Sequence, residues 1–128
     1  RTLLMKKDIE TEADVKLLVD TFYAQVLKDD VIGFIFTDVA KISLETHMPV
    51  MYKFWETLLL GTNDYQGNPM TKHFELNKKT ALLPEHFERW KKLWFSTLEN
   101  LFDGEVASEA KTRANTIAYL MESKMPKH

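Results

Sequence analysis

Two histidines of the chain stand within apolar helical stripes, where an imidazole can serve as a metal ligand. His47 lies one helical turn ahead of Met51 in one stripe, and His73 lies on a short segment flanked by two loops. His128 is terminal and His86 stands among charged neighbours, so we expect both at the surface. A lone histidine on an apolar face is most often an ordinary core residue. Two of them on different helices of one small domain favour a shared ligand site.

The residue types exclude several kinds of metal centre. The chain has no cysteine, so disulfides, thiolate catalysis and Cys-bound zinc or iron–sulfur sites are ruled out. A ferritin-like di-iron site needs Glu-x-x-His pairs, but Leu44 and Met70 stand three positions before His47 and His73. Haem needs one axial histidine and an apolar cavity, and large apolar residues are plentiful. Such a stripe is more often an ordinary core than the wall of a cofactor site, so these residues permit haem without establishing it.

Other chemistries find little support in the sequence. It contains neither a glycine-rich phosphate loop nor a nucleophile motif around Ser43 or Ser96. Lys and Arg total 17 against 19 Asp and Glu, a net charge of −2, so no positive surplus favours nucleic acid. No apolar run approaches the roughly 20 residues of a membrane span. Because no export signal is recognised, we expect a cytoplasmic protein.

Helices must position these residues. The length of 128 residues, with 45% hydrophobic and 28% charged residues, predicts a single globular domain over residues 1–128. Apolar residues recur at helical spacing and no strand-like alternation competes, so the predicted fold class is all-α. Residues 31–36 are interpreted as a short buried helix or turn. We predict longer helices from a capping box at Thr11, over 44–60, over 70–76, from Pro84 to about 102, and over about 105–125.

Two further aromatic residues place hydrogen-bond donors inside apolar stripes. Tyr23 and Trp90 each carry a donor that needs a partner when it is buried. That partner could be a backbone carbonyl or water. Alternatively, Tyr23, Trp90 and His47 form a polar cluster over a bound ligand.

The order of these motifs resembles the third group of the truncated haemoglobins. The resemblance covers about Asp8 to Met125, and its most specific part is the Tyr-x-Gly-x-Pro-Met-x-x-His stretch that ends at His73. The sequence departs from the family pattern at Leu44, where an aromatic residue is expected. Other matching segments are Phe22-Tyr23, residues 33–36, His47 with residues 54–56, and residues 59–61, 84–90, 113–114 and 117–118.

The resemblance implies a shortened globin fold, a two-over-two helical sandwich around haem b, which is iron protoporphyrin IX. It implies that His73 ligates the iron, and that Tyr23, His47 and Trp90 face the bound gas. The residues implied to line the cofactor are Phe36, Met51, Phe54, Trp55, Leu58, Met70, Phe87 and Met121.

For function, the resemblance implies reversible binding of oxygen and other diatomic ligands, nitric oxide and carbon monoxide, as in oxygen transport. One alternative uses the same haem for nitric oxide dioxygenase or peroxidase activity with an external reductase. Another is a haem-free helical interaction module. The colour of the purified protein distinguishes the haem-free module from the two haem proteins. Steady turnover of nitric oxide with a reductase distinguishes the enzyme from the gas-binding protein.

Overall fold

The computed structural model describes residues 6–62 and 69–125, apart from the side chains of residues 69–71 and 74. Within these residues all regular structure is helical, so the all-α prediction is confirmed. The elements in chain order are α1 (Glu12–Val26), a π-helical turn (Ile35–Val39), α2 (Leu44–Leu60), α3 (Pro69–Lys79), α4 (Pro84–Leu101) and α5 (Glu105–Lys124).

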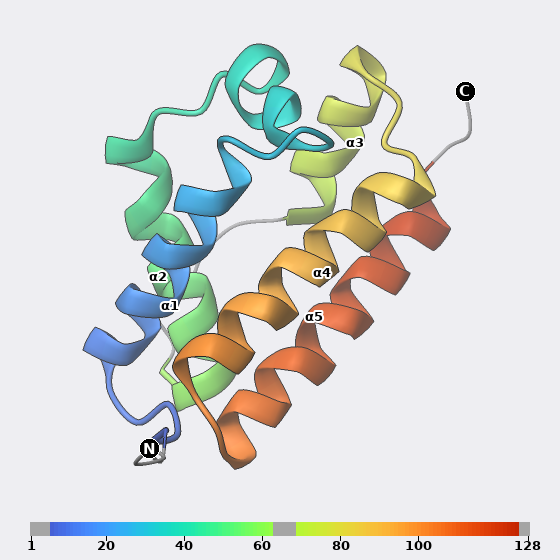
Figure 1. Ribbon diagram of the computed structural model, residues 1–128. Coiled ribbons are helices and arrows are strands. Elements are labelled where there is room, and N and C mark those ends of the chain that lie inside the picture. The colour runs from blue at the N-terminus through green and yellow to red at the C-terminus, as the bar shows by residue number, and fades with distance from the viewer. Residues whose placement is uncertain (1–5, 63–68, 126–128) are drawn as a thin grey trace.

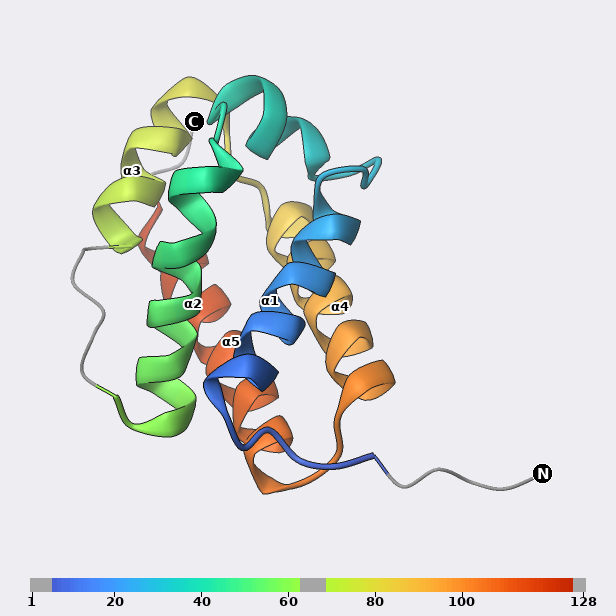
Figure 2. The same cartoon turned by 90° about the vertical axis from the view of Figure 1, so that its left-hand side faces the viewer.

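The four longer helices form two layers (Figures 1 and 2). α1 packs on α2 in one layer, and α4 packs on α5 in the other. Contacts of α1 with α4 and of α2 with α5 join the layers. α3 lies at the end of the bundle where α1 ends and where α2 and α4 begin. Tyr23, His47 and Trp90 therefore all belong to helix segments that meet at this end.

The start of α1 is fixed by the capping box that the sequence predicts. Thr11 Oγ1 accepts a hydrogen bond from the Asp14 amide at 3.2 Å, and Asp14 Oδ2 accepts one from the Thr11 amide at 3.1 Å. Lys7 Nζ lies 2.7 Å from the same carboxylate oxygen. Burial would raise the pKa of Asp14, but Lys7 and the backbone donors lower it. From this cap, α1 buries the predicted stripe, namely Val15, Leu18, Val19, Phe22, Tyr23 and Val26.

The start of α5 depends on a contact across 98 positions that no local pattern indicates. Asp8 Oδ2 accepts from the Val106 amide at 2.9 Å, and Asp8 Oδ1 from the Ala107 amide at 2.8 Å. Burial acts to raise the pKa of Asp8, but these backbone donors outweigh it and lower the pKa. Gly104 has φ +146°, and a β-carbon there would lie 2.4 Å from Asp8 Cγ. Glycine is therefore required where the N-terminal segment caps the last helix.

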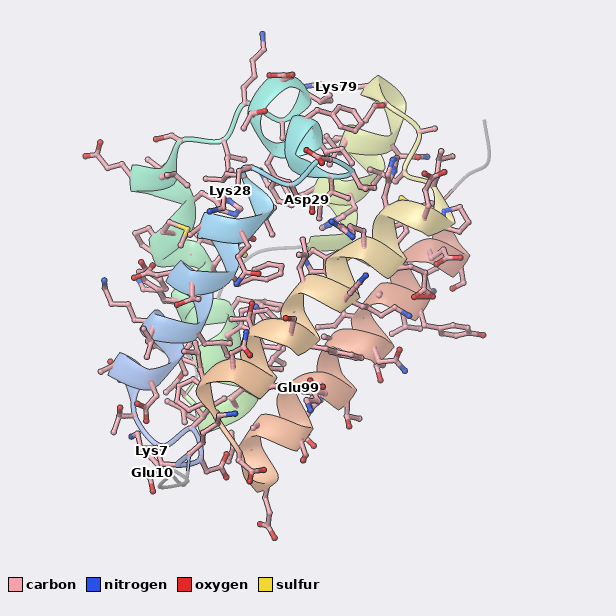
Figure 3. All side chains as sticks on the ribbon, in the orientation of Figure 1. Lys7, Glu10, Lys28, Asp29, Lys79 and Glu99 are labelled. Atoms are coloured by element: carbon pink, nitrogen blue, oxygen red, sulfur yellow. The ribbon has the colours of Figure 1, made fainter. Side chains whose placement is uncertain are left out.

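The turn after α1, which the sequence shows only as a polar break, ties α1 to α4 (Figure 3). Its Asp29 side chain is 5% exposed and forms an ion pair with Arg89, whose terminal nitrogen lies 2.7 Å from Asp29 Oδ1. The other carboxylate oxygen accepts from the Val31 and Ile32 amides at 3.0 and 3.1 Å. The hydrogen bond from Arg89 lowers the pKa of Asp29. This anchor fixes the helical turn that also carries Trp90.

Most helix ends agree with the sequence. α2 spans the predicted residues and ends at Gly61, which has a left-handed φ of 73°. α3 runs to Lys79, beyond the predicted end near residue 76. Asn77 is buried inside this added turn, and its side-chain oxygen accepts a hydrogen bond from the Leu82 amide at 2.9 Å. This bond holds the loop that follows α3, so the helix continues past residue 76. Among the described residues, no helix is long and apolar enough to cross a membrane.

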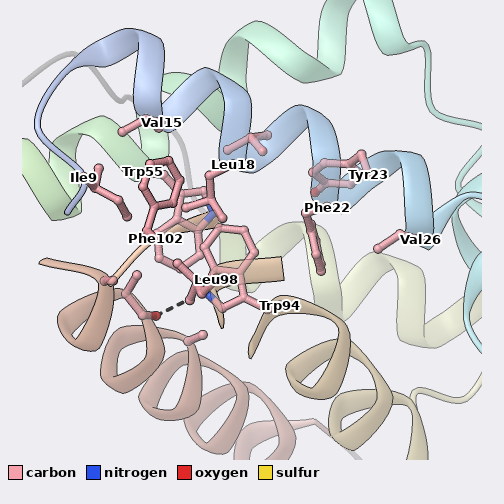
Figure 4. Packing of buried hydrophobic residues seen from close by; sticks show 14 of the residues in the cluster. Ile9, Val15, Leu18, Phe22, Tyr23, Val26, Trp55, Trp94, Leu98 and Phe102 are labelled. Atoms are coloured by element: carbon pink, nitrogen blue, oxygen red, sulfur yellow. Dashed lines mark hydrogen bonds between the residues drawn. The ribbon is translucent and has the colours of Figure 1, made fainter. Parts of the chain in front are cut away.

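The opposite end of the bundle holds a closed core (Figure 4). Trp94 is fully buried, and its indole N–H donates to the Ala110 carbonyl at 3.2 Å. Trp55 stacks on Trp94 with ring centroids 4.3 Å apart. Ile9, Val15, Leu18, Leu98 and Phe102 complete this group of buried residues.

Candidate functional site

Tyr23 and His47 form a polar pair inside an aromatic cluster. Tyr23 Oη lies 3.1 Å from His47 Nε2, and the two rings meet edge to face at 5.1 Å. The Tyr23 side chain is 7% exposed, and the rings of Phe22 and Phe36 lie 5.2 and 5.8 Å from it. The last turn of α1 and the first turn of α2 thus bring together two residues that are 24 positions apart.

Burial sets the charge state of this pair. It raises the pKa of Tyr23 and lowers the pKa of His47. Near neutral pH the phenol therefore keeps its proton and the imidazole is neutral. If His47 carries its proton on Nδ1, the phenol donates to Nε2. If the proton is on Nε2, that nitrogen donates to Oη, and the phenol proton can turn to another acceptor.

Trp90 supplies a second donor next to this pair. The centroid of its ring lies 5.9 Å from that of Phe22 in an edge-to-face contact, so Phe22 contacts both Trp90 and Tyr23. Among the described residues none accepts a hydrogen bond from the Trp90 indole N–H, which leaves this donor for a ligand or for water. The Arg89–Asp29 ion pair holds the α4 turn that presents it.

His73 lies half-buried in the middle of α3, the helix at the same end of the bundle. Within the described ranges, His, Cys, Asp and Glu side chains form no group of three or more that could hold a metal ion alone. A single imidazole is the protein ligand that a porphyrin iron requires, because the porphyrin supplies the other nitrogens.

Comparisons with known proteins decide which family this arrangement belongs to. No family model matches the chain. The group 3 truncated hemoglobin ctb of Campylobacter jejuni is 31% identical over 127 residues, which are 97% of this chain and 98% of that protein. A crystal structure of the group III truncated hemoglobin from Campylobacter jejuni matches with a TM-score of 0.84 and 29% identity. The match covers 96% of this chain and 97% of that one.

The chain belongs to the group 3 truncated haemoglobins. The resemblance and the shortened globin fold inferred from the sequence are confirmed. Membership of a haemoglobin family implies a haem cofactor and small diatomic ligands.

The surface of α2 fits such a cofactor. In this truncated haemoglobin only Trp55 and Glu56 of α2 are buried, although the helix carries a long apolar stripe. A flat apolar cofactor would cover the surface that the protein leaves half-exposed. The half-buried apolar residues are Met48, Met51, Phe54, Leu58, Leu59 and Leu60, whereas Tyr52 contacts Asp20 and Lys16 of α1.

The buried core is also divided at this end. A small cluster of Phe87, Ala118, Met121 and Met125 is separate from the main core. Leu82, Trp90 and Ile117 pack against both clusters but are themselves only partly buried. These three residues therefore connect the small cluster to the main core.

The predicted lining residues fall into different environments, and their roles stay predictions. Phe36, Met51, Phe54 and Leu58 are half-buried, as the edge of a cofactor site requires. Phe87 and Met121 are buried in the small cluster. Trp55 is buried against Trp94 in the main core, farther along α2 than His47. The side chain of Met70 lies outside the described residues.

The structure adds to the sequence analysis at two residues near the site, His86 and Phe22. His86, which was expected at the surface, is half-buried at the start of α4, and its Nδ1 accepts from the Leu83 amide at 3.0 Å. Its ring also meets Phe34 at 6.0 Å. Phe22 was not predicted as a site residue, yet it contacts both Tyr23 and Trp90. Its position beside Tyr23 in the α1 stripe is the only sequence signal for that role.

Proposed function

We propose that this truncated haemoglobin holds haem b through His73 and reversibly binds oxygen, with nitric oxide and carbon monoxide as further ligands. The observation that carries the proposal is the Tyr23–His47 hydrogen bond, with the Trp90 donor nearby at the same end of the bundle. When bound, the haem supplies the iron at which a diatomic gas is held. The chain supplies the rest of the pocket.

The donors favour a ligand that gains negative charge on binding. Tyr23 keeps its phenolic proton and lies in an apolar environment, where a hydrogen bond is stronger than in water. Trp90 can contribute only a donor, because an indole N–H accepts nothing. Both residues would therefore hold oxygen, which gains negative charge, more strongly than carbon monoxide, which gains little. Phe22 and Phe36 keep water away from the Tyr23 hydroxyl.

Dissociation of the two gases tests this function. We expect Tyr23→Phe and Trp90→Phe each to remove a charge-assisted bond of about 1–3 kcal/mol, which speeds oxygen dissociation roughly 5- to 150-fold. Carbon monoxide dissociation should change far less. Tyr119→Phe is a matched control, because this tyrosine is 71% exposed on α5. Equal changes for both gases would mean that the two residues only shape the pocket.

One observation favours oxidation chemistry as a second candidate function. The lowered pKa of His47 keeps its imidazole neutral near pH 7, next to a phenol that can relay a proton. Such a pair could support nitric oxide dioxygenation or peroxide reduction with an external reductase in the cytoplasm, the proposed compartment. Continued consumption of nitric oxide with a reductase would establish this activity. A single turnover per haem would leave gas binding as the function.

A further inference from the structure

All three tryptophans of the chain stand in one column through the molecule. The rings of Trp90 and Trp94 are parallel, with centroids 6.3 Å apart. Trp55 continues the column at 4.3 Å from Trp94, with 25° between the planes. Trp94 and Trp55 are 0% and 3% exposed, whereas Trp90 is half-buried (Figure 4 shows the two inner rings). A solute can therefore reach the tryptophan column (Trp90, Trp94 and Trp55) most easily at Trp90.

One helical turn before Trp55, α2 carries a tyrosine that has its own proton acceptor. Tyr52 precedes Trp55 by three residues on α2, so the two side chains lie on the same helix face. Tyr52 also packs against the core cluster that contains Trp55. Its hydroxyl donates a hydrogen bond to Asp20 on α1. Lys16 lies 5.4 Å from the Tyr52 ring centroid, and its charge is balanced by an ion pair with Asp20 at 3.2 Å.

We propose that the tryptophan column and Tyr52 form a path that carries oxidising equivalents from the ligand pocket to the protein surface. Indole and phenol are the side chains most easily oxidised by one electron, apart from cysteine, which this chain lacks. Stacked rings transfer an electron rapidly because their π orbitals overlap. Near neutral pH a phenol that can release its proton is oxidised slightly more easily than an indole, so the direction is toward Tyr52.

The charge balance of each step is simple. An oxidant takes one electron from Trp90, and electrons then move from Trp94 to Trp90 and from Trp55 to Trp94. Tyr52 supplies the final electron to Trp55, and its O–H bond breaks as the proton passes to Asp20. Asp20 is partly exposed and releases that proton to water. Any proton that Trp90 loses to water on oxidation returns when its electron is replaced.

Peroxides are the class of oxidant for which such a path is useful. Hydrogen peroxide takes up two electrons and two protons to become two molecules of water. After each passage along the path, a phenolic donor in solution would return one electron and one proton to Tyr52 and Asp20, so two such donors balance one peroxide. The location of Trp90 in the pocket rests on the proposed function, but the path from Trp90 to Tyr52 does not. An experiment in which the oxidant comes from solution therefore tests the path by itself.

Pulse radiolysis of the haem-loaded ferric protein in bromide solution supplies that oxidant. The dibromide radical anion takes one electron, leaves two bromide ions and oxidises tryptophan in preference to tyrosine at neutral pH. We expect indolyl absorption to decay by a first-order reaction, and a nitroso spin trap to label Tyr52, as located by peptide mass spectrometry. Trp94→Phe should slow that decay by an order of magnitude or more and remove the label from Tyr52.

Further variants keep the test decisive if the Trp94→Phe protein folds poorly. Tyr52→Phe should leave the indolyl radical long-lived, and Asp20→Asn should slow its decay and increase the solvent deuterium isotope effect. Tyr119→Phe, the exposed control, should change nothing. Unchanged decay in Tyr52→Phe, or a label that stays on Tyr23 or Tyr119 whatever variant is used, would overturn the path.

Discussion

The two ends of the helical bundle are built on different principles. At the closed end, where α1 begins and α4 ends, Trp94, Leu98 and Val15 are completely buried. Asp8 and Asp14 fix the helix starts there with several backbone hydrogen bonds each. At the ligand end, where α2 and α4 begin, the apolar residues Met48 and Met51 of α2 are only half-buried. The polar groups of that end include a buried phenol and a half-buried imidazole that form a hydrogen bond with each other.

This difference indicates which part of this small globin is stable without a cofactor and which part a cofactor would stabilise. The closed end needs nothing beyond the chain, because its apolar side chains cover one another and its helix ends are capped. The ligand end has apolar surface that the chain does not cover. Binding of a cofactor to that surface would stabilise the folded protein by mass action. Substitutions at the two ends should therefore behave differently with and without haem.

The largest expected effect is the loss of haem from His73→Ala. If His73 is the axial ligand on α3, its removal should leave haem unbound or bound only when imidazole is added. His47→Ala is the matched control, since it removes a half-buried histidine from the same end but not the proposed ligand. We expect that variant to retain haem. The measurement is the haem absorption spectrum after gel filtration.

Two results would contradict this assignment. Full haem occupancy and an unchanged ferrous spectrum in His73→Ala would show that another residue ligates the iron. Loss of haem in His47→Ala but not in His73→Ala would mean that the roles of the two histidines are reversed.

A pair of leucines tests the contrast between the fully buried core and the half-buried apolar stripe of α2. Leu98→Ala removes a fully buried side chain from the closed end and should cost about 2–5 kcal/mol of unfolding free energy, with or without haem. Leu58→Ala removes a half-buried side chain from α2, so it should cost clearly less in the haem-free protein. With haem bound, the cost of Leu58→Ala should increase. Urea unfolding of both forms measures these differences, and equal costs for Leu58→Ala in the two forms would place it outside the haem contact.

The sequence predicted the helices well because their signals are local. The Thr11 capping box, the glycine after α2 and the proline at the start of α4 each act within a few residues. The helix cap and the ion pair that were not predicted both join residues that are distant in the sequence. Asp8 caps α5 from 98 positions away, and Asp29 pairs with Arg89 across 60 positions. Neither pairing leaves a periodic pattern in the sequence.

The site could be predicted in part for the same reason. Tyr23, His47 and Trp90 are recognisable as polar groups inside apolar stripes, but spacing alone cannot show which of them touch. The resemblance to a family supplied that grouping. The structure adds that Tyr23 and His47 form a hydrogen bond and that Phe22 contacts both Tyr23 and Trp90. The deep burial of Trp55 against Trp94 could not be foreseen, because an α2 stripe looks the same whether protein or cofactor covers it.

A smaller effect is expected at the closed end from Asp8→Asn. The folded-state pKa of Asp8 is lowered, so its ionised form contributes stability above the unfolded pKa of about 3.9, and this contribution is lost as pH falls through the folded pKa. Replacing this cap should cost about 0.5–2 kcal/mol near pH 7 and progressively less in acid. Asp103→Asn, an exposed neighbour of Gly104, serves as the control. A cost for Asp8→Asn that stays constant in acid would contradict the capping role.

The smallest effect concerns the ligand end and depends on the pKa of His47, which burial lowers below its usual value of about 6.5. As pH falls through this lowered pKa, both ring nitrogens carry protons, and Nε2 must donate to Tyr23 Oη. The phenol proton is then released from His47 and can turn to the ligand. One such bond of about 0.5–1.5 kcal/mol would slow oxygen dissociation by about 2- to 12-fold in acid.

Stopped-flow measurement of oxygen dissociation between about pH 8 and pH 5 tests this switch at the ligand end. The unfolded state binds the His47 proton more readily than the folded state, so the free energy of unfolding declines below about pH 6.5. Circular dichroism at each pH must therefore show that the protein is still folded. Tyr23→Phe and His47→Ala should each abolish the pH dependence, whereas Asp8→Asn at the closed end should retain it. Persistence of the dependence in Tyr23→Phe would assign the proton to another group. Faster dissociation in acid would mean that protonation separates the Tyr23–His47 pair instead of reversing its hydrogen bond.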